Sequence, residues 1–173
     1  MPIDIAAVRR DPMWVLLPLR LFLGVTFLYA GLSKIADRSF LDAAAPTGMH
    51  ATTLAVKNSS PIGGLLQPVI DHSFAFGLLM ALAEVAVGIG VLFGLFARIA
   101  ALGGLALSLS LFLTVSWNAD PWYTGADLVY ALALTPLLLA GRTPLSVDEW
   151  MASLEARPGA DLSPAAGRTR RAA

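Results

Sequence analysis

The chain of 173 residues contains no cysteine, and it has only two histidines. The missing thiols exclude disulfides, thiol catalysis, zinc–thiolate sites and cysteine-ligated iron–sulfur clusters for this chain acting alone. His50 and His72 lie outside the long apolar segments, which excludes a haem held between two intramembrane histidines. We therefore predict no metal site. If electrons move through this protein, this polypeptide does not carry them on a metal of its own.

Charge is also scarce, because charged residues make up 14% of the chain and the formal net charge is zero. Soluble domains have about 25% charged residues. With no basic face among the expected helices, we do not expect nucleic acid as a partner. Hydrophobic residues reach 57% and are concentrated in blocks. This distribution favours lipid around the helices, so the lipid bilayer is the first predicted partner.

The apolar blocks predict an all-α integral membrane protein, a four-helix transmembrane bundle over residues 13–141. The expected spans are residues 13–35, 74–96, 99–117 and 124–141. A hydrocarbon core of about 30 Å needs about 20 helical residues. The fourth block, Ala126 to Ala140, is short and contains Pro136, so we expect it to span by recruiting flanking residues.

The distribution of basic residues predicts the orientation. Most arginines, and no lysine, fall on the side shared by the two termini and the turn between the second and third spans. The positive-inside rule then places both termini in the cytoplasm, including an N-terminal segment over residues 1–12. Two lysines against ten arginines suggest a GC-rich bacterial source. The expected location is the bacterial plasma membrane.

Three segments outside the spans also have sequence patterns that predict their structure. Residues 36–73 mix turn residues with short apolar runs, which predicts short helices over the outer mouth of the bundle; a disordered outer loop is the alternative. After the fourth span, Ser146 to Glu149 has the form of a capping box and opens an amphipathic helix over residues 145–155, suited to the membrane interface. Residues 156–173 are expected to form a disordered basic tail.

Arg20 and Glu84 are opposite charges well inside the first and second spans. A lone Arg in a membrane helix costs roughly 2.5–3.5 kcal/mol on insertion scales, so two opposite charges at similar depths favour a pair. Depths counted from the ends of the apolar blocks predict that the two side chains meet. The pair is a candidate quinone or proton site. Alternatively, it is a buried ion pair that sets helix register.

Small residues recur on the same helical faces as these charges. Gly24 and Gly31 share a face of the first span, and Gly77 and Gly88 share a face of the second. Small residues let membrane helices approach closely, so these four glycines are predicted to be packing positions.

A second polar cluster is expected at the outer edge of the bundle. It comprises Lys34 at the end of the first span and Asp127 and Tyr130 at the start of the fourth. Asp127 has a simpler interpretation as well, because a carboxylate near a helix N-terminus caps the helix and complements its dipole.

These residues resemble the DoxX family of small four-helix bacterial membrane proteins, which is related to the DoxD subunit of thiosulfate:quinone oxidoreductase. The resemblance runs from Met13 to Trp150 and rests on two patterns of charged and small residues. One is R-x-x-x-G…AGLSKI from Arg20 to Ile35. The other is E-x-x-x-G-x-G-x-L-x-G-L-x-x-R from Glu84 to Arg98. The resemblance implies a quinone-linked redox role, with quinone as the candidate cofactor, or a membrane partner for soluble redox or detoxifying enzymes.

Three functions stay open from the sequence. The first is a quinone-interacting membrane component of an oxidoreductase, in which Arg20 and Glu84 polarise or protonate the quinone oxygen. The second is a non-catalytic membrane anchor or scaffold for soluble redox or detoxifying enzymes. The third is a pathway for protons or a small solute, although the usual transporter signs are missing. The candidate protein partners are a soluble redox enzyme, a second subunit or another copy of the chain.

Overall fold

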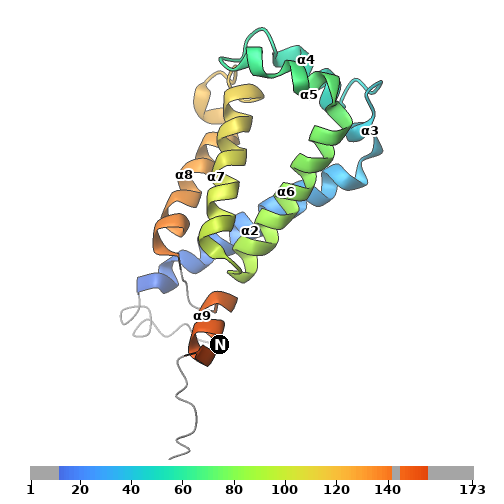
Figure 1. The fold of residues 1–173 in the computed structure, drawn as a ribbon. Coiled ribbons are helices and arrows are strands. Elements are labelled where there is room, and N and C mark those ends of the chain that lie inside the picture. The colour runs from blue at the N-terminus through green and yellow to red at the C-terminus, as the bar shows by residue number, and fades with distance from the viewer. Residues whose placement is uncertain (1–11, 142–144, 156–173) are drawn as a thin grey trace, which may run out of the picture.

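The computed structural model describes residues 12–141 and 145–155, and every regular element in this part of the chain is a helix (Figure 1). Four long helices form the body: α2 (Leu17–Ala36), α6 (Ser73–Phe93), α7 (Ala97–Thr114) and α8 (Ala126–Ala140). The 3₁₀ helix η1 (Pro12–Leu16) precedes α2. The predicted N-terminal segment, apart from Pro12, and the predicted tail lie outside the described residues.

Three helical stretches are long and apolar enough to cross a membrane: Met13–Ala36, Ser73–Phe93 and Ala97–Thr114. The helix α8 is apolar but has 15 residues. Its length is about 22 Å, which is less than a hydrocarbon core of about 30 Å. The residues just before it, Trp122–Thr124, form the 3₁₀ helix η3 and do not lengthen it. The fourth span therefore stays a prediction.

The four long helices pack as two pairs that share one core. α2 packs mainly against α6, α7 packs mainly against α8, and a tight turn joins α6 to α7 (Figure 1). All four helices contribute to the buried core, whose members are Leu23, Phe27, Val87, Val91, Ala101, Leu134 and Leu137. Large apolar side chains are also exposed on the outside, including Tyr29, Ile99 and Leu139. This outer surface is suited to lipid.

Glycines set the distance between α2 and α6. A Cβ added at Gly24 would lie 2.8 Å from the backbone of Leu92, and one at Gly31 would lie 2.6 Å from the carbonyl oxygen of Ala81. Gly88 is pressed in the same way against the backbone of Leu28. These three glycines therefore lie at the helix crossing, where no side chain fits.

Gly77, the fourth predicted packing glycine, has different neighbours. Its nearest contacts are the side chains of Leu41, Met49 and Phe40, which belong to the connection between α2 and α6. It lets this connection, and not α2, approach α6.

The connection between α2 and α6 contains short helices, as the sequence predicts. They are α3 (Arg38–Leu41), α4 (Met49–Val56), η2 (Gly63–Leu65) and α5 (Gln67–Asp71). They lie across one end of the bundle, which we call the Lys34 end (Figure 1). Two hydrogen bonds tie the connection to α7 and to the loop that follows it: Ser60 donates to the carbonyl oxygen of Leu113 at 2.7 Å, and Asn118 donates to Ser59 at 2.6 Å.

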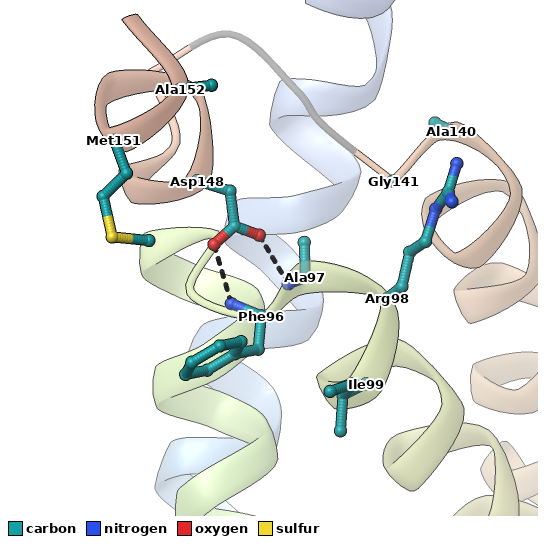
Figure 2. Close-up of a pocket in the computed structure, with 9 residues that line it drawn as sticks. All are labelled: Phe96, Ala97, Arg98, Ile99, Ala140, Gly141, Asp148, Met151 and Ala152. Atoms are coloured by element: carbon teal, nitrogen blue, oxygen red, sulfur yellow. Dashed lines mark hydrogen bonds between the residues drawn. The ribbon is translucent and has the colours of Figure 1, made fainter. Parts of the chain in front are cut away.

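At the opposite end, α9 (Val147–Glu155) caps the start of α7 (Figures 1 and 2). The turn after α6 contains Gly94 and Phe96, both with positive φ, so α7 begins without a capping side chain of its own. Asp148 supplies the cap, because its carboxylate accepts the backbone N–H groups of Phe96 and Ala97, each at 2.9 Å. One of the two hydrogen bonds of the predicted capping box is present, since the Ser146 hydroxyl accepts the N–H of Glu149 at 3.1 Å.

The α2–α6 crossing gives the first testable prediction. Gly88→Ala should lower the free energy of unfolding by about 1–3 kcal/mol, because the added methyl overlaps the backbone of Leu28. Gly64→Ala is the matched control, since nothing lies within 4 Å of its added Cβ, and it should change stability by less than about 0.5 kcal/mol. Thermal unfolding in detergent, followed by circular dichroism, measures both. Equal melting temperatures for the two variants would contradict the close approach.

Candidate functional site

The predicted contact between Arg20 and Glu84 is wrong. The carboxylate of Glu84 instead pairs with Lys34, whose Nζ donates to Oε1 at 2.7 Å and to Oε2 at 2.6 Å. Arg20 lies toward the other end of α6, with its Nη1 3.4 Å from the position of a Cβ at Gly94. Glu84 and Gly94 are about 15 Å apart along the helix axis.

The register of α2 against α6 explains this correction. Gly24 faces Leu92, and Leu28 faces Gly88. The two helices are therefore antiparallel, and a step of four residues toward the C-terminus of α2 matches a step of four residues toward the N-terminus of α6. Continuing this register places Arg20 beyond the end of α6, and it places the last turn of α2 opposite Glu84. The predicted depths assumed that the ends of the apolar blocks lie level. Instead, α2 and η1 extend past the turn between α6 and α7 (Figure 1).

The Lys34–Glu84 pair is the main candidate site. Glu84 is buried, with 3% of its side chain exposed, whereas 24% of the Lys34 side chain is exposed. A lysine ammonium has three donors, and two of them reach the carboxylate. The ammonium therefore has one donor beyond these two hydrogen bonds. The pair thus combines a buried carboxylate with a lysine whose side chain is partly exposed.

The short helix α3 covers this pair. The ring of Phe40 lies 5.9 Å from the Nζ of Lys34, which is a cation–π distance. Asp37 caps α3 by accepting the backbone N–H of Ser39 at 2.9 Å and its hydroxyl at 2.7 Å. The hydroxyl and the backbone N–H of Ser39 hold the pKa of the Asp37 carboxyl below its usual value. The cap is therefore present above the ordinary pKa of Asp and is lost only as the pH falls through the lowered one.

The predicted outer cluster is divided between two environments. Asp127 lies close enough to Glu84 for a Coulomb interaction, and its carboxylate accepts a hydrogen bond from the hydroxyl of Ser116. Tyr130 is partly buried beside the apolar core instead, with its ring centroid 6.3 Å from those of Phe22 and Phe27. Lys34 and Asp127 thus flank Glu84, and the Tyr130 ring supports α2.

Arg20 has a neighbourhood of its own, which we call the Arg20 end. Arg20 is 4% exposed, and its Nη2 donates to the carbonyl oxygen of Leu145 at 3.1 Å. Glu149 contributes a Coulomb interaction. Leu145 and Glu149 lie just before and within α9, so Arg20 connects α2 to the segment that caps α7. This geometry favours a structural role for Arg20.

Sequence reasoning missed two of these partnerships. Asp148 lies inside the capping box, but a box predicts only the start of its own helix, and the capped N–H groups lie about fifty residues earlier in the chain. The Lys34–Glu84 pair depends on the offset between α2 and α6, which the ends of the apolar blocks do not specify. Within residues 12–141 and 145–155, no three His, Asp or Glu side chains are arranged to hold a metal ion.

The apolar helices, the buried charge pair and the exposed apolar surface define the class of the protein, a helical membrane protein with few intramembrane charges. A family model described as "TQO small subunit DoxD" matches residues 15–155. The chain belongs to this DoxD family. The match confirms the predicted resemblance at the level of DoxD-like proteins, and it leaves the DoxX label untested. No curated protein and no solved structure matches the chain.

The asymmetric burial of the pair gives the second prediction. Lys34→Met leaves a buried carboxylate without its partner and should destabilise the protein by about 3 kcal/mol or more. Glu84→Gln should cost less, because the partly exposed ammonium can turn toward water. The double variant should be more stable than Lys34→Met alone. Unfolding in detergent measures all three, and Lys57→Met, at a partly exposed lysine, and Asp120→Asn, at an exposed aspartate, are the controls. Additive losses in the double variant would contradict a direct pair.

The cap on α7 gives the third prediction. Asp148→Ala removes the acceptor of two backbone N–H groups, so the amides of Phe96 and Ala97 should exchange with solvent deuterium faster. A lost cap costs about 0.5–2 kcal/mol, which corresponds to roughly two- to thirtyfold faster exchange at these amides. Amides in the middle of α6 serve as the internal reference. Unchanged exchange at both positions would show that Asp148 does not hold the turn.

Proposed function

We propose that the protein is a quinone-linked membrane component of an oxidoreductase system, and that the Lys34–Glu84 pair is its proton-handling site. The family match supports the redox association, because DoxD is described as the small subunit of TQO. The observation that carries the site is the pairing of a buried carboxylate with a partly exposed lysine inside the helical body. Arg20 is not part of this proposal, because its contacts lie at the other end of the bundle.

The residues present fit the oxygen of a quinone. The ammonium of Lys34 can donate its third hydrogen bond to a carbonyl oxygen, and the carboxylate of Glu84 can take up or release a proton beside it. A bound quinone would accept two electrons and two protons when it is reduced to the quinol. The electrons would come from a partner subunit or a soluble redox enzyme. Asp127 next to Glu84 offers a second carboxylate toward the Lys34 end.

The covering helices suit this role. Phe40 and the other residues of the connection shield one side of Lys34 while leaving part of the side chain exposed. Excluding water around a charge pair strengthens its electrostatic interactions and limits proton leakage. In this proposal α8 forms the fourth span, both termini face the cytoplasm, and the Lys34 end faces outward in a bacterial plasma membrane.

A second candidate function is a membrane anchor for a soluble redox or detoxifying enzyme. One observation favours it: α9 exposes Trp150, Met151 and Leu154 at the Arg20 end. These residues share one face of the helix, and an exposed apolar face suits a docking partner as well as a membrane interface. A pathway for protons or a small solute is the third candidate, and the same charged residues would serve it.

The fourth prediction tests the proton-handling site. Protein purified in mild detergent should retain quinone, measured by solvent extraction and chromatography. Glu84→Gln and Lys34→Met should lose most of it. Quinone reduction by membranes containing the partner should fall about a hundredfold or more in Glu84→Gln, the scale of a lost acid–base group. Asp120→Asn and Lys57→Met, which also remove one charge each but at an exposed and a partly exposed residue away from the pair, should keep both properties.

The outcomes separate the candidate functions. Full quinone retention and full reduction rates in Glu84→Gln would contradict the proposed site. Full activity together with loss of partner recruitment on Trp150→Ser would favour the anchor. Proton or solute flux into vesicles that contain this chain alone would favour the pathway.

A further inference from the structure

A groove lies at the Arg20 end, where the start of α7, the end of α8 and α9 meet (Figure 2). Its volume is about 660 Å³, which is within the range of sites for small ligands. The groove lies at the far end of the bundle from the Lys34–Glu84 pair. It therefore belongs to neither the candidate site nor the proposed reaction.

The wall of the groove combines one cation with exposed apolar side chains. Arg98 is the only basic residue among the described residues that line it, and its side chain is exposed. Within residues 12–141 and 145–155, Arg98 takes part in no hydrogen bond or ion pair. Ile99 is 70% exposed, Phe96 62% and Met151 37%. The guanidinium is thus available to an anion, and apolar surface lies beside it.

Gly141 contributes to the position of this cation. Its φ is +70°, and a Cβ added there would lie 3.0 Å from the Nη2 of Arg98 (Figure 2). A side chain at this position would displace the guanidinium. The absence of one leaves Arg98 lying along the end of α8.

The groove also lies at a defined depth. The stretch of α7 that is long and apolar enough to cross a membrane begins at Ala97, so its first turn marks one boundary of the apolar region. Lipid headgroups occupy that level of a bilayer. A guanidinium there can bind a phosphate through charge-assisted hydrogen bonds, while neighbouring apolar side chains contact the glycerol and the first acyl carbons.

We propose that this groove binds an anionic phospholipid, with its phosphate on Arg98 and its upper acyl region against Ile99 and Met151. Asp148 also lines the groove, but its two carboxylate oxygens accept the backbone N–H groups of Phe96 and Ala97, and among the described residues it forms no salt bridge with Arg98. Because α9 forms one wall, a bound lipid would contact both α7 and the helix that caps it.

Native mass spectrometry of the full chain in neutral detergent tests this proposal. The probes are dioleoyl phosphatidylglycerol and dioleoyl phosphatidylcholine, added in equal amounts. The wild type should bind one phosphatidylglycerol with about fivefold preference, the effect of one basic side chain near an anionic headgroup. Arg98→Gln should lose the preference, and Arg98→Lys should keep part of it. Arg38→Gln, at an exposed arginine of the Lys34 end, is the matched control and should behave as wild type.

A second variant tests the groove by shape. Ala152→Trp places a large ring on the α9 wall while leaving Arg98 unchanged, and it should lower occupancy by phosphatidylglycerol at least fivefold. Equal binding of the two lipids by the wild type would overturn the proposal, as would an unchanged preference in both Arg98→Gln and Ala152→Trp. Displacement of phosphatidylglycerol by millimolar inorganic phosphate would also overturn it, because the site would then recognise the free anion.

Discussion

The close approach of α2 and α6 is the constraint on which the rest of the structure depends. Gly24 and Gly88 remove side chains from the points where the two backbones meet, each glycine facing a leucine of the other helix. Packing of this kind replaces the hydrophobic effect as the source of helix association in lipid. Because each of these two glycines lies directly opposite a leucine, the crossing also sets the register of α2 against α6. The register then determines which charges can meet.

That register separates the charges of the membrane region between the two ends of the bundle. At the Lys34 end, Glu84 meets a lysine from the last turn of α2, under a cover made by the connection to α6. At the Arg20 end, Arg20 holds the segment that leads into α9, and α9 in turn caps α7. One end therefore carries a charge pair suited to proton chemistry. At the other end, Arg20 connects α2 to the segment before α9, and an open groove lies nearby.

This division bears on what a DoxD protein of this size can do. In the proposed redox role, the buried carboxylate and the partly exposed lysine would exchange a proton with a ligand oxygen, and electrons would come from a partner. In the proposed scaffold role, the exposed face of α9 would bind the partner. The redox role and the scaffold role therefore use different parts of the same molecule and are compatible.

The sequence by itself determined the class of the protein, since long apolar blocks with few charges are stable as helices in lipid. It also indicated the packing glycines, the capping box and the short helices over one end, because these depend on neighbouring residues. Only the tertiary structure decided that Glu84 pairs with Lys34 and that Asp148 caps α7. Those partners depend on how far one helix slides along another, and block boundaries do not specify that offset. Contacts along the full length of the helices specify that offset, and these contacts form only in the folded chain.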